Sequence, residues 1–171
     1  PPPSNVVSKT SWSAKKDTVE VKPVIWENSS YRTLKRIKLP QNTIEGVNAI
    51  VALKDEIKTG EELKVLNMSN LTFLAYELGY KPDTGPDFPL WFHQGVAFFD
   101  REAETLCNRV KEGRYDIVLF EDMPDVDNFF PYSVRDCLRE NNYTLVTRFL
   151  SPTGYLTDSV EVYTKVIKDI P

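Results

Sequence analysis

The sequence has few of the residues on which most catalytic and cofactor sites depend. Its 171 residues include one histidine, two cysteines and seven glycines. A single histidine and two cysteines without CxxC spacing do not suit a zinc site. The glycines do not form the GxGxxG fingerprint of dinucleotide-binding proteins. We therefore expect no metal ion, no NAD and no other cofactor.

The chain also lacks long apolar runs and an excess of positive charge. No stretch approaches the roughly 18 consecutive apolar residues of a membrane span, and the N-terminus does not resemble a signal peptide. The net charge of −4 argues against nucleic acid as a partner, because phosphate binding requires a basic patch. With 41% hydrophobic and 27% charged residues, the composition is typical of one globular domain.

The residues that are present predict alternating helices and strands. Residues 115–120 are almost entirely apolar, as in a strand that is covered by helices on both faces. Apolar residues at helical spacing predict helices over 45–58, 101–111 and 131–141. Short segments rich in apolar residues predict strands over 63–68, 143–150 and 159–167. The expected fold is α/β, three-layered and Rossmann-like, with a mostly parallel sheet and an antiparallel C-terminal hairpin.

This α/β domain is predicted to span residues 42–171, after an irregular arm formed by residues 1–41. In the arm, the alternation of Thr18–Lys22 indicates a short edge strand that Pro23 would end. A basic group follows, made of Arg32, Lys35, Arg36 and Lys38. We favour a solvated face for this group over an anion-binding or membrane-surface site.

The two cysteines, Cys107 and Cys137, each fall on the apolar side of a predicted helix. We favour two buried free thiols over a disulfide, because a disulfide would require the two helices to lie side by side.

The first candidate site is the acidic loop after the strand at 115–120. Glu121, Asp122 and Asp125 lie there, and ligands of open α/β sheets bind at the carboxyl ends of strands. Such carboxylates can bind a divalent cation or sugar hydroxyls. However, their spacing lacks the glycine and the terminal glutamate of a calcium loop. We favour a solvated acidic loop for these residues.

The second candidate is the proline- and aromatic-rich stretch 81–99. Trp91 and Phe92 can stack on a sugar or contact a partner, although packing into the domain's own core is favoured. Any Ser-His-Asp triad would need His93, but the chain has no GxSxG motif, so a structural role is favoured. We expect a ligand or partner surface where this stretch meets the loop containing Glu121, Asp122 and Asp125.

The order of segments resembles a known arrangement. The segments are Glu61-Glu-Leu-Lys-Val-Leu66, Lys111-Glu-Gly-Arg-Tyr-Asp-Ile-Val-Leu119, Asn142-Tyr-Thr-Leu-Val-Thr-Arg-Phe149 and Val160-Glu-Val-Tyr-Thr-Lys165. Over roughly residues 42–167, the chain resembles the soluble C-terminal domain of multi-pass membrane glycosyltransferases that use lipid-linked sugars, the protein-mannosyltransferase and aminoarabinose-transferase group. The catalytic acids of that group lie in loops between membrane helices, so none of them has a counterpart here.

The resemblance implies a non-catalytic accessory domain on the extracytoplasmic face of a membrane, periplasmic or equivalent. Its partners would be the membrane-embedded part of the same polypeptide and a glycan or lipid-linked sugar. The start at Pro1, without a methionine, leads us to expect a longer protein. Two alternatives stay open: a soluble nucleotide- or S-adenosylmethionine-binding enzyme similar to methyltransferases, and a protein-interaction module that uses residues 82–99.

Overall fold

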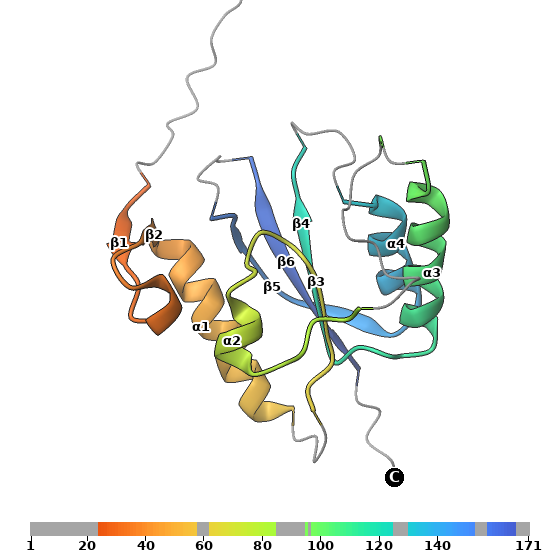
Figure 1. Cartoon of the computed structure of the whole chain (residues 1–171), viewed down its shortest axis with the longest axis horizontal. Coiled ribbons are helices and arrows are strands. Elements are labelled where there is room, and N and C mark those ends of the chain that lie inside the picture. The colour runs from red at the N-terminus through yellow and green to blue at the C-terminus, as the bar shows by residue number, and fades with distance from the viewer. Residues whose placement is uncertain are drawn as a thin grey trace, which may run out of the picture.

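The computed structural model describes residues 24–57, 62–84, 95, 97–124, 130–152 and 157–166. Their main feature is a four-stranded sheet with the order β3-β4-β6-β5 (Figure 1). The strands are β3 (Val65–Met68), β4 (Ile117–Asp122), β5 (Tyr143–Leu150) and β6 (Ser159–Lys165). β3 and β4 run parallel, whereas β6 is antiparallel to both of its neighbours.

This topology confirms the α/β class and the antiparallel C-terminal hairpin, formed by β5 and β6. The prediction of a mostly parallel sheet is wrong for the four described strands. After the connection that follows β5, the chain returns as β6 and inserts between β5 and β4, which makes both pairings of β6 antiparallel. The apolar run in β4 did not reveal this, because a strand that is buried on both faces is apolar whatever the direction of its neighbours.

Helices lie on both faces of the sheet (Figure 1). α1 (Gln41–Glu56) and α2 (Leu74–Leu78) pack on one face, and α3 (Phe99–Lys111) and α4 (Tyr132–Glu140) on the other. Because side chains alternate along a strand, β4 contributes to two separate cores. Ile117 and Leu119 pack with α1 and α2, while Val118 and Phe120 pack with α3 and α4.

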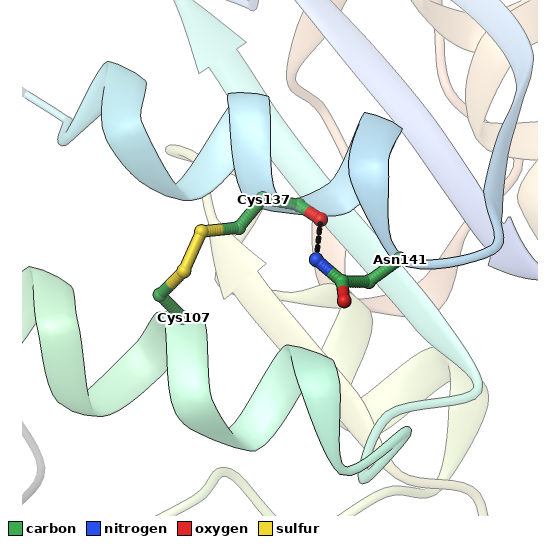
Figure 2. Close-up of a disulfide and its surroundings, with 3 residues drawn as sticks. All are labelled: Cys107, Cys137 and Asn141. Atoms are coloured by element: carbon green, nitrogen blue, oxygen red, sulfur yellow. Dashed lines mark hydrogen bonds between the residues drawn. A yellow bond between two sulfur atoms is a disulfide. The ribbon is translucent and has the colours of Figure 1, made fainter.

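The disulfide between Cys107 and Cys137 joins α3 to α4 (Figure 2). The two Cα atoms are 5.7 Å apart, within the range that a disulfide requires. The carbonyl of Cys137 also accepts a hydrogen bond from the Asn141 side chain at 2.7 Å. The expectation of two free thiols is therefore wrong, because α3 and α4 lie side by side on the same face of the sheet.

A small antiparallel ribbon precedes α1. It consists of β1 (Trp26–Asn28), the 3-10 helix η1 (Arg32–Leu34) and β2 (Lys38–Pro40). Leu34 and Leu39 of this ribbon are buried. The sequence did not predict these short strands, and the strand expected at Thr18–Lys22 lies outside the described residues.

β5 forms one of the two edges of the sheet. Its pairing with β6 is interrupted between Leu145 and Thr147, where an extra residue, Val146, forms a β-bulge. Leu145 and Val146 are exposed at this edge.

α1 approaches β5 closely at Gly46. A Cβ atom at this position would overlap the ring of Phe149, which is buried between the helix and the sheet. The glycine therefore sets how near α1 lies to the sheet, although glycine is a poor helix former.

Gly46→Ala should lower the free energy of unfolding by about 1–3 kcal/mol, because the overlap with Phe149 outweighs the better helix propensity of alanine. Urea denaturation measures the change. Phe149→Leu should make room for the added methyl group, so Gly46→Ala should cost less in that background. An equal cost in both backgrounds would contradict the proposed overlap.

Candidate functional site

The structure describes two of the six residues that the sequence nominated. Trp91, Phe92, His93 and Asp125 lie outside the described residues. Glu121 and Asp122 are the last two residues of β4 and are therefore in the strand rather than in a loop. Because they are consecutive strand residues, their side chains lie on opposite faces of the sheet. The solvated acidic loop predicted for them is wrong for both residues.

Glu121 is buried on the face covered by α1 and α2, with 1% of its surface exposed. Its carboxylate accepts a hydrogen bond from the backbone N–H of Asn70 at 2.7 Å and another from the hydroxyl of Ser151. Burial raises the pKa of the Glu121 carboxyl group, and the nearby charge of Asp158 acts in the same direction. The two hydrogen bonds oppose this shift because they stabilise the charged form.

The turn after β3 is held by its own side chains. The Asn67 amide donates to the carbonyl of Leu71 at 3.0 Å and to the Tyr80 hydroxyl at 3.2 Å. The Ser69 hydroxyl donates to the Asn67 side chain at 2.6 Å. In a nucleotide-binding α/β protein, backbone N–H groups of the corresponding turn bind phosphate. Here the N–H of Asn70 binds the Glu121 carboxyl group instead, so an internal side chain occupies that position.

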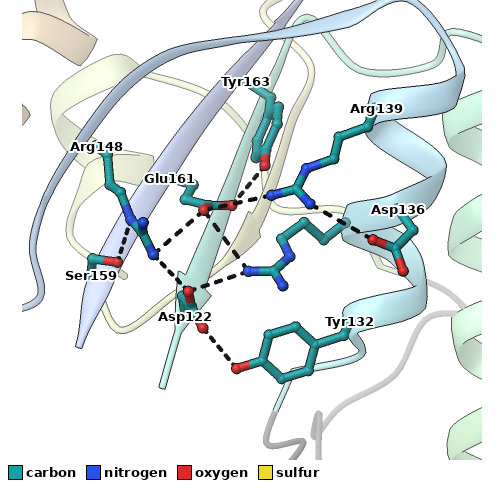
Figure 3. Close-up of polar contacts among 9 residues, drawn as sticks. Asp122, Tyr132, Asp136, Arg139, Arg148, Ser159, Glu161 and Tyr163 are labelled. Carbon is teal, nitrogen blue, oxygen red and sulfur yellow. Dashed lines mark hydrogen bonds and ion pairs between the residues drawn. The ribbon is translucent and has the colours of Figure 1, made fainter. Parts of the chain in front are cut away.

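Asp122 lies on the opposite face and belongs to an arginine–carboxylate cluster, defined by Asp122, Arg135, Arg139, Arg148 and Glu161 (Figure 3). Its carboxylate lies 2.6 Å from Arg148 and 3.2 Å from Arg135. It also accepts a hydrogen bond from the Tyr132 hydroxyl at 2.8 Å. β4, β5, β6 and α4 all contribute to this cluster.

Glu161 is the buried centre of this cluster, with 3% of its surface exposed. The three arginines surround it, with closest N–O distances of 3.6 Å to Arg148, 3.9 Å to Arg135 and 4.0 Å to Arg139. The hydroxyl of Tyr163 donates to it at 2.6 Å. Burial, together with this hydrogen bond to a carboxylate, raises the pKa of Tyr163 to about 12, so the hydroxyl stays protonated at neutral pH.

Arg135 is the least exposed of the three arginines, and it is held from two sides. Its guanidinium lies 4.5 Å from the ring centre of Tyr132 and 5.5 Å from that of Phe120, as in cation–π contacts. Its ion pairs join the two carboxylates, Asp122 and Glu161. The cluster therefore holds three arginines around two carboxylates and fastens α4 to the sheet.

A third polar group lies at the opposite end of the sheet. Asp83 accepts hydrogen bonds from Arg109 at 2.9 Å, Arg114 at 3.2 Å and the Tyr115 hydroxyl at 2.9 Å. It borders a cavity of about 260 Å³ next to the amino ends of β3 and β4. This volume is below the range of typical ligand sites, which begins at about 300 Å³. The carboxyl ends of the strands, where the sequence predicted a site, lie away from it.

The sequence reasoning missed these ionic groups. One signal was present: Glu161 is a charged residue between two apolar ones, Val160 and Val162, in the middle of a strand. Arg135 and Arg139 are one helical turn apart, which places them on one side of α4. Neither pattern indicates which carboxylate an arginine contacts, because those partners come from other elements.

Comparison with known proteins identifies no relative. The chain matches no family model, no curated protein and no solved structure. Within the described ranges, no three histidine, cysteine or acidic side chains are grouped so that they could hold a metal ion. The helices in that part of the chain are also too short or too polar to cross a membrane.

The buried position of Glu121 predicts a specific pH dependence of stability. Its pKa is raised in the folded state above the ordinary value of 4.5, so the folded protein binds this proton more tightly than the unfolded chain does. The contribution of Glu121 to stability is therefore largest below about pH 4.5 and declines as the pH rises through the raised pKa. Glu121→Gln removes this titration and keeps an acceptor for the Asn70 N–H.

We expect the stability of Glu121→Gln, relative to the original protein, to increase from pH 4.5 towards neutral pH. Urea denaturation of both proteins across this range measures the difference. All other titrating groups are shared by the two proteins, so they cancel to first order. A difference that is constant with pH, or that decreases, would contradict the raised pKa.

Proposed function

We propose that this chain is a non-catalytic, extracytoplasmic domain of a membrane glycosyltransferase-like protein. The observation that carries the proposal is the disulfide between Cys107 and Cys137. Disulfides persist in oxidising compartments such as the periplasm or the secretory pathway and are rare in the cytosol. The segment order described above supplies the relationship to glycosyltransferases, and a Rossmann-like origin of the β3–α3–β4 unit is part of the same proposal.

The non-catalytic role is supported by the contacts of the two described candidate acids, which are engaged with other residues of the domain. A general acid or base must reach its substrate, but Glu121 is buried and hydrogen-bonded to Asn70 and Ser151. Asp122 is held by two arginines and a tyrosine. In this proposal the catalytic acids belong to the membrane-embedded part of the polypeptide. The domain contacts that part and helps to position a glycan or lipid-linked sugar.

The alternative of a soluble nucleotide- or S-adenosylmethionine-binding enzyme has less support. Such an enzyme needs an open turn after the first parallel strand, with backbone N–H groups available to the ligand. Here the N–H of Asn70 is already bound by Glu121, and side chains fill the turn from Asn67 to Ser69. We therefore do not propose this activity.

Two measurements test the proposal. The reading frame that encodes this chain should contain several hydrophobic spans on the N-terminal side of Pro1. In cells, Cys107 and Cys137 should resist a maleimide–polyethylene glycol reagent under denaturing conditions, and should react with it after reduction. A full-length protein without hydrophobic spans would refute the glycosyltransferase relationship. Labelling of both thiols without reduction would refute the extracytoplasmic location.

A further inference from the structure

The ribbon formed by β1, η1 and β2 exposes large apolar side chains. Ile25, Trp26 and Ile37 are 59%, 45% and 48% exposed. Trp26 is the first residue of β1, whereas Ile25 directly precedes β1 and Ile37 directly precedes β2. In the register of the ribbon, Trp26 lies on the same face as Lys38, whereas Ile25 and Ile37 lie on the other face. An exposed tryptophan beside a cation is a feature of interaction surfaces.

The same ribbon is basic in a chain that is acidic overall. Residues 24–40 contain four cations, Arg32, Lys35, Arg36 and Lys38, and one carboxylate, Glu27, which gives a net charge of +3. The whole chain has a net charge of −4. No described carboxylate forms an ion pair with Lys35, Arg36 or Lys38, and all three side chains are exposed. Their charges are therefore available to an external anion.

The ribbon is fixed to the domain through other side chains. The Tyr31 hydroxyl donates to the Asn48 side chain on α1 at 2.5 Å, and the Thr33 hydroxyl donates to Glu77 on α2 at 2.5 Å. Leu34 and Leu39 are buried beneath it. The residues that hold the ribbon in place thus differ from those that it exposes. The exposed set is presented in a defined arrangement beside α1 and α2 (Figure 1).

We propose that the β1–β2 ribbon binds the surface of a lipid bilayer that contains anionic lipids. The Trp26 side chain enters the boundary between headgroups and acyl chains, while lysine and arginine contact lipid phosphates. Protein partners of ordinary affinity need about 800 Å² on each side, more than two strands of three residues present. Exposed lysines are also depleted at protein interfaces but favour anionic membranes.

This binding does not depend on the proposed glycosyltransferase relationship, since it rests on the ribbon alone. Flotation of the 171-residue chain with vesicles tests it. We expect binding to vesicles of phosphatidylcholine and phosphatidylglycerol, weaker binding as salt is raised, and little binding to phosphatidylcholine alone. Trp26→Ala should weaken binding to the anionic vesicles at every salt concentration.

Variants that remove positive charge from the ribbon test whether the ribbon is the surface that binds the membrane. The combination of Lys35→Gln, Arg36→Asn and Lys38→Gln should reduce partitioning about 100-fold, following roughly fivefold for each basic side chain near an anionic surface. Asparagine is chosen at position 36 because Arg36 has a φ of 72°, which asparagine tolerates. The matched control removes three exposed cations elsewhere, by Lys81→Gln, Arg101→Gln and Lys111→Gln.

The control variant should bind like the original chain, and thermal denaturation should show both variants folded. The proposal is overturned by three outcomes: no binding to anionic vesicles, equal binding to neutral ones, or equal losses in the two triple variants. Capture of an acidic protein without vesicle binding would assign the ribbon to a different partner. None of these results affects the search for hydrophobic spans or the labelling of the two cysteines. The membrane-binding proposal and the glycosyltransferase proposal can therefore be refuted independently.

Discussion

Replacing Cys107 and Cys137 together by alanine should lower the free energy of unfolding by about 3–4 kcal/mol. The disulfide closes a loop with a sequence separation of 30 residues, and removing such a cross-link restores conformational entropy to the unfolded chain. For a domain of this size the melting temperature should fall by about 10 °C. Alanine suits both positions, which lie inside helices.

Reduction provides the control for this variant. Dithiothreitol should destabilise the original protein by a similar amount and should leave the alanine variant unchanged. Calorimetry or circular dichroism with and without the reductant measures both effects. If the reductant has no effect on the original protein, the disulfide does not contribute as described.

Arg135→Met should lower the free energy of unfolding by about 2 kcal/mol, as for the loss of a hydrogen bond between charged groups. Arg135 pairs with Asp122 and with the buried Glu161. The loss stays below that of a fully uncompensated buried charge, because Arg148 also contacts both carboxylates. Methionine keeps much of the apolar contact with Phe120 and Tyr132, so the loss reports mainly the missing charge.

Arg139→Met is the matched control, because it removes the same charge from the same helix. The Arg139 side chain is half exposed, and its nearest contact with Glu161 is 4.0 Å. We expect a loss of only about 0–1 kcal/mol, as for other solvent-exposed ion pairs. Chemical denaturation compares the two variants. Equal losses would mean that burial does not determine the strength of these contacts.

The sequence predicted the parts of the fold that depend on local patterns. The uninterrupted apolar run of β4 indicated a strand covered on both faces, and helices were expected at α3 and α4. The direction and position of β6 were not predictable, because a strand's own residues do not specify which neighbour it joins. The β1–β2 ribbon was missed because its three-residue strands depend on pairing and on packing against α1.

In the candidate site, too, the sequence predicted what depends on local patterns and missed what depends on contacts between elements. The sequence identified Glu121 and Asp122 as the carboxylates at the end of β4 but placed them in one loop. In the structure the strand extends to include them, and the alternation of side chains separates them onto different faces. Their partners, Asn70, Ser151 and Arg148, are distant in the sequence, so no local pattern could reveal them. The pairing of Cys107 with Cys137 likewise depends on which helices become neighbours.

The β-bulge at Val146 has a consequence for self-association. β5 is an edge strand with exposed Leu145 and Val146, and such an edge offers backbone groups to which a second molecule can add a strand. The bulge interrupts the regular spacing of those groups in the middle of the edge. A second copy could therefore form only a short ladder here, which protects the folded domain against edge-to-edge aggregation.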